Sequence, residues 1–426
     1  MTEPGSNVPV EDSFDTSPDI SADAEGAWVR REGALAGLRV LDLTRILSGP
    51  FASMVLADLG ADVIKIEDTR GGDDTRRWGP PFQGDDAAYF HAVNRNKRSL
   101  AIDLKTEVGL DIVLRLATSA DVVLENFRPG TAERLGLGYP QLAQRNPRIV
   151  YGSVSGFGQT GPESRRAGYD AIAQAMSGVM GITGPADGEP VRFGVAGADL
   201  GAGMWATIGV LAALRSRDET GQGQHVDISL LDGQMSWLTY AAQNYFASGE
   251  RPRRYGSAHP NIVPYQSFPT ESGEIMVAVG NDSLWRRFAP VVGLGHLVDD
   301  PRYATNPDRV ARRDELLPLI AEAFLGRPST EWAALLEEAG VPAGPVHEVD
   351  EALAQEQVLA REMVVDLPHT DLGTVRTLGS PLKLTGTPTT LRTASPTYGE
   401  HTRELLTAMG LGETDIDALA EQGVVR

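Results

Sequence analysis

The sequence contains no cysteine, and histidine is scarce, with 7 in 426 residues. The lack of cysteine excludes disulfides, thiolate nucleophiles and cysteine metal ligands, and it favours a cytoplasmic protein. The histidines never fall at the spacing of a metal-binding pair. We therefore expect no metal site and no permanently bound cofactor.

Positive charge is also in short supply. The chain has 38 Lys and Arg against 58 Asp and Glu, a formal net charge of −20. Such a charge repels nucleic acid and anionic membrane surfaces, so we expect neither as a partner. The first residues lack a basic start and an apolar core, and we expect no signal peptide. Residues 1–32 are acidic and poor in apolar side chains, which predicts a disordered tail.

Two familiar catalytic motifs, the Walker phosphate loop and the G-x-S-x-G nucleophile elbow, are missing. A glycine pattern typical of dinucleotide sites is present as "GFGQTG", residues 156–161, after an expected strand. Pro162 and a polar "ESRR" follow it instead of an apolar helix, and no acid lies about twenty residues further on. A nicotinamide-dependent oxidoreductase stays a weak alternative, and a turn that lets the backbone approach a ligand is the better interpretation.

Short β-branched runs alternate with helical patterns from Leu38 onward. The expected strands lie in "LRVLDLT", "ADVIKIE", "SLAIDL", "DVVLENF" and "RIVYGSVSGFG". This alternation predicts an α/β fold with a parallel sheet, whose ligands bind at the carboxyl ends of the strands. The residues from 226 to 344 look like a second domain. Periodicity alone leaves open whether residues 345–426 complete that domain or return to the first.

The apolar stretch "GVAGADLGAGMWATIGVLAAL", residues 194–214, holds one carboxylate, Asp199. The acid and the glycines make a membrane-spanning helix a poor interpretation. Asp199 stands at or near the start of a helical pattern, where its carboxylate is expected to accept amide hydrogen bonds and to stay ionised. Gly197, Gly201 and Gly203 are expected to leave room for a ligand. A carboxylate in that setting is either a helix cap or a covalent nucleophile.

Two further segments carry candidate site residues. "ENFRPGTAER" follows an expected strand and places an amide, an aromatic ring and guanidinium groups around a turn, which suits a nucleotide with phosphates. "GYDAIAQAMSG" opens a helix with Tyr169 and Asp170. We expect Asp170 to be a structural cap, and Tyr169 either to be buried or to line the site.

Together these segments resemble the class III CoA-transferase family, which includes formyl-CoA, carnitine-CoA and succinyl-CoA transferases and α-methylacyl-CoA racemase. The resemblance rests on "LRVLDLTRILSGPFASMVLADLGADVIKIE", "NRNKRSLAIDL", "ENFRPG", "GFGQTGP", "AGYDAIAQAMSG", the Asp of "GADLGAG" and "TGQGQHVDISLLD". It implies that Asp199 is the catalytic nucleophile. It implies a CoA thioester as substrate, bound by Ile46, Ile102, Lys105, Asn126, Phe127, Arg134 and Tyr169.

One position departs from the family pattern. A basic residue common after "KIE" is here Asp68, so phosphate contact is expected to shift to Arg70. The glycine-rich lid of the formyl-CoA transferases is also absent, and "GSAHPNIVPYQSF" takes its place with His259 as a candidate lid residue. The carboxyl-terminal motifs look most like the branch that uses succinate and glutarate. A second substrate carboxylate would need a cation, supplied by Arg45, His259 or one of Arg251, Arg253 and Arg254.

The resemblance also implies an architecture. A large Rossmann-like domain comes from both chain ends, residues 33–225 and 345–426, with a smaller α+β domain between them at 226–344. Two subunits interlock as rings in a homodimer. The racemases carry a histidine where this chain has Tyr169, and a phenol is a poor base at neutral pH, so transfer is favoured over racemisation. A catalytically silent CoA-binding protein stays open as a third alternative.

Overall fold

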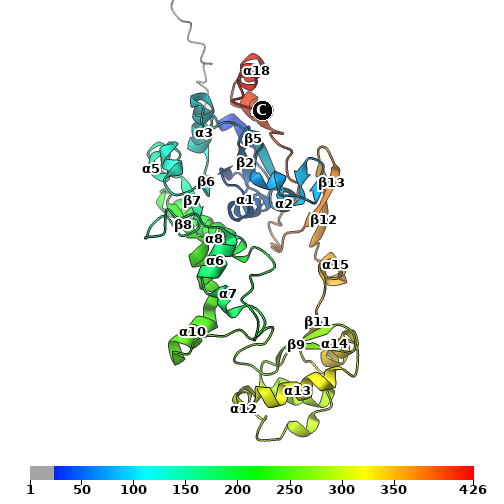
Figure 1. Ribbon diagram of the computed structural model, residues 1–426. Coiled ribbons are helices and arrows are strands. Elements are labelled where there is room, and N and C mark those ends of the chain that lie inside the picture. The colour runs from blue at the N-terminus through cyan, green and yellow to red at the C-terminus, as the bar shows by residue number, and fades with distance from the viewer. Residues whose placement is uncertain (1–23) are drawn as a thin grey trace, which may run out of the picture.

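A six-stranded parallel sheet forms the centre of the computed structural model, which describes residues 24–426 (Figure 1). The strand order is β5 (Lys97–Ala101), β2 (Asp62–Glu67), β1 (Arg39–Asp42), β6 (Val122–Glu125), β7 (Val150–Ser155) and β8 (His225–Ser229). All six strands run parallel. The α/β class and the strands expected from the sequence are thereby confirmed.

Alternate residues of each strand bury into opposite faces of the sheet, as a two-residue period requires. Leu41, Ile64 and Val123 face α3 (Glu107–Ser119) and α5 (Tyr139–Arg145). Val40 and Val63 face α1 (Ser48–Asp58) and α8 (Gly197–Thr220) on the other side. Helices on both faces explain why the strand sequences read as nearly continuous apolar runs.

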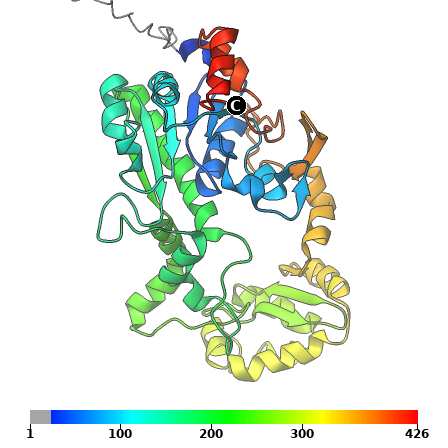
Figure 2. The same cartoon turned by 45° about the horizontal axis from the view of Figure 1, so that its top comes forward.

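The end of the chain returns to the large domain, which answers the question that periodicity left open. Helices α17 (Thr402–Ala408) and α18 (Glu413–Glu421) bury Leu405, Leu419 and neighbouring side chains in the core beside α3. Ile102 pairs with Val425 in an isolated antiparallel bridge. Figure 2 shows this red segment lying against the blue start of the fold.

A second, smaller domain has its own core. An antiparallel sheet of β11 (Ala343–Pro345), β10 (Glu274–Ala278) and β9 (Tyr265–Pro269) packs against α11 (Asp282–Val291), α13 (Arg313–Phe324) and α14 (Ser329–Glu338). Helix α12 (Asn306–Ala311) and η4 (Gly295–Leu297) complete it.

The expected boundary at residue 226 is wrong, because β8 pairs with β7 in the large sheet. Helix α9 (Leu230–Met235) then packs on α8, so the large domain continues past residue 226.

Two separate connections join the domains (Figures 1 and 2). The first follows η3 (Ser236–Leu238) and α10 (Thr239–Ser248); the second contains α15 (Val349–Ala354) and α16 (Glu356–Ala360). The hairpin of β12 (Val364–His369) and β13 (Gly373–Leu378) follows the second connection. The chain therefore traces a ring through both domains. Shorter elements are η2 (Asp74–Arg77), β3 (Phe82–Gln83), β4 (Asp86–Ala87), α2 (Ala88–Ala92), α4 (Thr131–Arg134), α6 (Asp170–Met176) and α7 (Val179–Ile182).

The expected disordered tail, residues 1–32, is only partly covered by the structure. Residues 1–23 lie outside the described part of the chain. Residues 24–32 depart from the expectation: η1 (Ala24–Ala27) buries both of its alanines against α3 and α17. The Trp28 indole donates to Ser119 Oγ at 2.8 Å, which fixes the segment further.

Helix α8 is long and apolar enough, by length and composition alone, to cross a membrane. In the fold it is a core helix that packs on α1, α9 and β7, and 56% of its most apolar window is buried.

Replacement of Leu405 tests whether the carboxyl-terminal helices hold the large domain together. Leu405 is fully buried, so Leu405→Ala should lower the free energy of unfolding by about 2–5 kcal/mol. The measurement is urea denaturation followed by circular dichroism. Thr407→Ala on the exposed face of the same helix is the matched control and should stay within about 0.5 kcal/mol of the parent. Equal stabilities for all three proteins would contradict this packing.

Candidate active site

Asp199 lies in the first turn of α8, at the carboxyl-terminal edge of the parallel sheet. Its side chain lines a cavity of about 170 Å³ together with loops that follow β1, β6 and β7. Ile46, Asn126, Phe127 and Tyr169 line the same cavity. Five residues expected from the sequence to share a site are thus brought together by four separate segments.

The amino terminus of α8 is capped by Asp170, not by Asp199. Asp170 Oδ1 accepts hydrogen bonds from the backbone N–H of Ala198 at 2.7 Å and of Asp199 at 3.3 Å. The expectation that Asp199 itself caps the helix is wrong, because Asp199 is already inside the first turn and Ala196 is the N-cap residue. Asp170 is a cap as expected, but for a helix that begins 27 residues further along the chain.

Among residues 24–426, therefore, no backbone amide donates to the Asp199 carboxylate to stabilise its charge. Burial and, to a smaller extent, the negative charge of Asp170 raise the pKa of Asp199 to about 7, against the opposing effect of a hydrogen bond from Ser48. The expectation that the helix terminus keeps Asp199 ionised is thus corrected. Near neutral pH this carboxyl group exchanges a proton.

The loop after β1 is held in an unusual conformation. Ile46 has φ 74°, which is left-handed and rare for a β-branched residue. Its N–H donates to both carboxylate oxygens of Asp73 at 3.2 Å. Asp73 is in turn ion-paired with the fully buried Lys65, whose Nζ also donates to Thr44 O at 2.8 Å. A buried ion pair beneath the loop therefore fixes the backbone that lines the cavity.

The loop after β6 is tied to the loop after β1. Asn126 accepts from Arg45 N–H at 3.0 Å and donates to Arg45 O at 2.7 Å, so its amide pairs with the backbone like a neighbouring strand. The next residue, Phe127, donates its N–H to Glu125 at 2.8 Å. Burial raises the pKa of Glu125 to about 7. The two loops consequently form one wall.

The sequence suggested that the glycines of α8 leave room for a ligand. In the structure, Gly201 and Gly203 instead allow close packing of α8 against its neighbours. A β-carbon on Gly203 would lie 2.6 Å from Ser48 O, and one on Gly201 would lie 2.7 Å from the Trp237 ring. The Gly203 contact brings α8 close to the start of α1, where Ser48 lies, and the Gly201 contact brings α8 close to η3.

Three guanidinium groups, those of Arg45, Arg128 and Arg166, line the Asp199 cavity. The sequence makes Arg45 a candidate for binding a substrate carboxylate, and Arg128 is one of the two arginines of "ENFRPGTAER". Sequence reasoning missed Arg166, because its "ESRR" segment indicates only the end of a glycine motif. It also missed Ser48, which no local pattern distinguishes.

Two further cavities adjoin the first. One, of about 270 Å³, is lined by Ile102 and Lys105 and shares Arg45 and Phe127 with the Asp199 cavity. The other, of about 680 Å³, is lined by Arg134 and shares Arg128 and Pro129 with it. The remaining residues expected to bind CoA therefore lie in cavities that border the first.

Arg70 is the exception among those residues. Its guanidinium is bound by Asp68, with Nε and Nη2 at 2.8 and 2.5 Å from the two carboxylate oxygens. That contact lowers the pKa of Asp68 to about 2. Within the described part of the chain Arg70 lines none of the three cavities, whereas Asp68 lines the one that contains Lys105.

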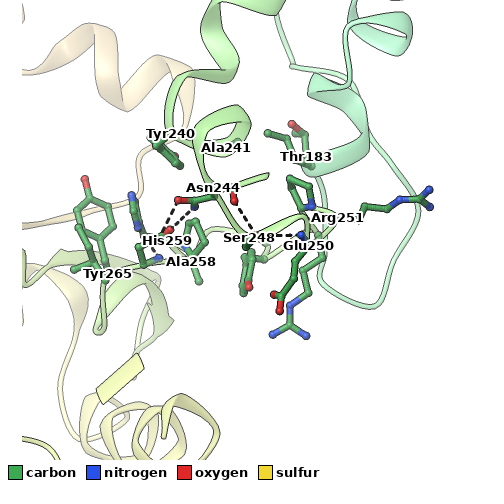
Figure 3. A pocket seen from close by; sticks show the side chains of 18 of the residues that line it. Thr183, Tyr240, Ala241, Asn244, Ser248, Glu250, Arg251, Ala258, His259 and Tyr265 are labelled. Carbon is green, nitrogen blue, oxygen red and sulfur yellow. Dashed lines mark hydrogen bonds between the residues drawn. The ribbon is translucent and has the colours of Figure 1, made fainter. Parts of the chain in front are cut away.

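His259 lies in a different cavity, of about 1130 Å³, between α10 and the small domain. Figure 3 shows its ring between Tyr240 and Tyr265, with ring centres 4.9 and 5.4 Å away. Arg251 and Arg253 line this cavity too, and Arg254 donates to Gly188 O nearby. Among the described residues of one chain, these side chains are not brought to Asp199.

The "GFGQTG" turn does not lead into a helix. Gly161 is followed by irregular backbone until α6 begins at Asp170. Gly156 packs against the backbone of Gly168, where a β-carbon would lie 2.6 Å from its Cα. A pyrophosphate would find no helix terminus in this described segment, which removes the geometric basis for nicotinamide binding.

Over residues 24–426, no group of three or more His, Asp or Glu side chains is arranged to hold a metal ion.

Comparison with known proteins identifies the family. Residues 35–402 match the model of CoA-transferase family III. The chain belongs to CoA-transferase family III. A succinate–glutarate CoA-transferase of Agrobacterium fabrum is 45% identical over 382 residues, covering 88% of this chain and 96% of that protein. The human succinyl-CoA:glutarate CoA-transferase is 41% identical over 392 residues, covering 92% and 90%. A solved CAIB/BAIF family protein from Brucella suis has TM-score 0.80 at 42% identity, covering 89% of this chain and 100% of that one.

The raised pKa of Asp199 predicts a pH-dependent stability. The folded protein holds this proton up to about pH 7, whereas the unfolded chain releases it near 3.8, so stability is lost as pH rises through that window. Asp199→Asn removes the titration and should be more stable than the parent at pH 8 by about 2 kcal/mol, with a smaller difference at pH 4. Urea denaturation at both pH values measures this. A less stable variant at pH 8 would show that the surroundings favour the charge.

Proposed function

We propose that this transferase moves CoA from an acyl-CoA donor to a dicarboxylic acid of the succinate or glutarate type, with Asp199 as the nucleophile. The observation that carries the proposal is a partly buried carboxyl group without amide caps, in a cavity lined by three arginines. The relatives named for succinate and glutarate support the substrate class.

The reaction proceeds through two acyl-enzyme species. The Asp199 carboxylate attacks the thioester carbonyl, the C–S bond breaks, and a mixed anhydride and the CoA thiolate result. The thiolate attacks the aspartyl carbonyl and releases the donor acid, which leaves an aspartyl-CoA thioester. The acceptor carboxylate then attacks that thioester, and the same steps run in reverse. The Ser48 hydroxyl, which contacts Asp199, is placed to donate to oxygen during these steps.

We assign the three adjoining cavities to different parts of CoA. Its thioester end would lie beside Asp199, with Ile46, Asn126, Phe127 and Tyr169 around it. The more distant groups would occupy the cavities that contain Ile102, Lys105 and Arg134. Binding of the distant groups keeps the released thiolate close to the anhydride, which raises its effective concentration. We do not assign Arg70 to CoA binding, because its guanidinium is bound by Asp68.

Racemisation is the less supported alternative. It needs a base near neutral pKa opposite Asp199. Tyr169 lines the cavity where the racemases have histidine, and none of the described residues around the cavity is a histidine. The oxidoreductase alternative is not supported, because in the described segment after "GFGQTG" no helix begins that could bind a pyrophosphate. The third alternative, a catalytically silent binding protein, predicts CoA affinity without chemistry.

We also propose the interlocked homodimer and a cytoplasmic location. Exposed apolar side chains gather on α8, η3 and α10, among them Trp205, Ile208, Trp237 and Phe246. A surface of this kind marks a protein interface. The ring-shaped path of the chain through two connections is the topology that interlocking requires. The lack of cysteine supports a reducing compartment.

A matrix of acyl-CoA donors and carboxylic acid acceptors tests the proposed reaction. Succinyl-CoA or glutaryl-CoA with the other free acid should give the fastest exchange. Hydroxylamine added with the donor should convert Asp199 to a hydroxamate, detected by peptide mass spectrometry. Asp199→Asn should stay folded and bind CoA but lose at least about 10³-fold in kcat, because an amide is a far weaker nucleophile. Exchange and trapping that persist in this variant would assign the nucleophile elsewhere.

Arg45 is our assignment for the second substrate carboxylate. It lines the Asp199 cavity, is exposed, and has only a loose ion pair with Asp74 at 3.6 Å. Arg45→Met should lower kcat/KM for succinate and glutarate by about 10–100-fold and for butyrate much less. The matched control is Arg77→Met, since Arg77 pairs with the same Asp74 but is not among the described residues that line the three cavities. Equal losses for dicarboxylates and butyrate would assign Arg45 to CoA instead.

A further inference from the structure

Asp170 occupies the one place where a helix terminus could have stabilised the charge of Asp199. Its Oδ1 takes the N–H groups of Ala198 and Asp199 at 2.7 and 3.3 Å. The amides at the start of α8 therefore serve a second carboxylate, and that carboxylate stands beside the proposed nucleophile.

The position of Asp170 is fixed on both sides. Gln174, fully buried one turn later in α6, donates to Asp170 Oδ2 at 2.7 Å and accepts from Phe193 N–H at 2.9 Å. With both oxygens engaged, the carboxylate cannot rotate away from Asp199. The arrangement therefore imposes a fixed negative charge on that site.

Few described groups offset this charge. Ser48 on α1 donates to Asp199. Burial raises the pKa of Tyr89 on α2 to about 12, and the charges of Asp199 and Asp170 act in the same direction. Tyr169 and the guanidiniums of Arg45, Arg128 and Arg166 line the cavity, and all four side chains are exposed to solvent. Exposure screens the cations, whereas Asp170 acts through the partly buried start of α8.

We propose that Asp170 is a positioning residue that decides which carbonyl of the mixed anhydride the CoA thiolate attacks. The inference rests on the proposed function. Attack at either carbonyl breaks its bond to the bridging oxygen and expels the other half as a carboxylate. Attack at the donor carbonyl only re-forms the donor thioester. Attack at the aspartyl carbonyl releases the donor acid and advances the transfer.

The charge of Asp170 makes these two routes unequal. Attack at the donor carbonyl must expel Asp199 as a second carboxylate beside Asp170, which like-charge repulsion opposes. Attack at the aspartyl carbonyl expels an ordinary carboxylate and leaves Asp199 as a neutral thioester. The repulsion is relieved in the productive direction only. The same charge makes ionised Asp199 more basic and so a better nucleophile in the first step.

Asp170→Asn is the direct test, because the asparagine carbonyl can still accept the two α8 amides while the charge is lost. The ascending limb of kcat/KM against pH, with succinyl-CoA as donor, should move down by about 1 pH unit. A second measurement is made at a pH above the ascending limbs of both the parent and the variant. It compares free enzyme plus succinyl-CoA with the aspartyl-CoA thioester plus succinate, and this equilibrium should shift about tenfold toward the free enzyme. Intact-protein mass spectrometry at fixed succinate measures the thioester fraction.

Two other variants separate charge from structure. Gln174→Ala removes one brace but keeps the charge, which the Ala198 and Asp199 amides still hold beside Asp199. It should therefore lower the melting temperature and leave the pH limb and the thioester equilibrium in place. Asp170→Ser also caps a helix without charge and should reproduce both shifts if the asparagine variant folds poorly. Folded Asp170 variants with an unchanged limb and an unchanged equilibrium would overturn the inference. Absence of thioester in the parent with every donor would overturn the proposed function and the inference with it.

Discussion

The close approach of α8 to α1 is the contact on which the candidate site depends. Gly203 lets the two helices meet where any side chain would collide with Ser48 O. One turn earlier on α8 stands Asp199, and the start of α1 supplies the Ser48 hydroxyl that reaches it. Because α1 and α8 cover the same face of the sheet, the carboxyl ends of β1, β6 and β7 lie around this point. A side chain at residue 203 would separate Asp199, the proposed nucleophile, from its hydrogen-bond donor.

The rest of the cavity is held by charges buried below it. Lys65 and Asp73 fix Ile46 in a left-handed conformation, and Lys97 pairs with Asp42 beside them. Such pairs add little to stability, because removing two charges from water costs about as much as their attraction returns. Their value here is rigidity, since they hold the loop after β1 in a conformation that isoleucine alone would avoid. The site is therefore supported by buried ion pairs within a sheet whose other side chains are mostly apolar.

The sequence alone predicted the parallel sheet, its strands and the segments that meet at its edge, because those depend on local periodicity and turn residues. It also singled out Asp199, as the one carboxylate in the apolar stretch 194–214. It could not predict that Asp170 caps α8, because that bond joins residues 28 and 29 positions apart through a helix packing that no local pattern shows. The same reason explains the misread role of Gly201 and Gly203 and the unnoticed Arg166. The predicted domain boundary at residue 226 is wrong because the sequence of an edge strand such as β8 does not show which sheet the strand joins.

A partly buried carboxyl group with a hydroxyl as its donor and a second carboxylate beside it is costly to ionise, and the fold places that cost on Asp199. Asp73 and Glu67 lie deeper than Asp199, yet each has a cationic partner that lowers its pKa. Asp199 has instead a second carboxylate and one hydroxyl, so its charge is disfavoured in the resting protein. Each covalent species in the proposed reaction replaces that charge with a neutral acyl group. In the proposed reaction the unfavourable electrostatics of the free site thus favour acylation of Asp199. This accounts for an arrangement in which the amides at the start of α8 bind Asp170 and not the proposed nucleophile.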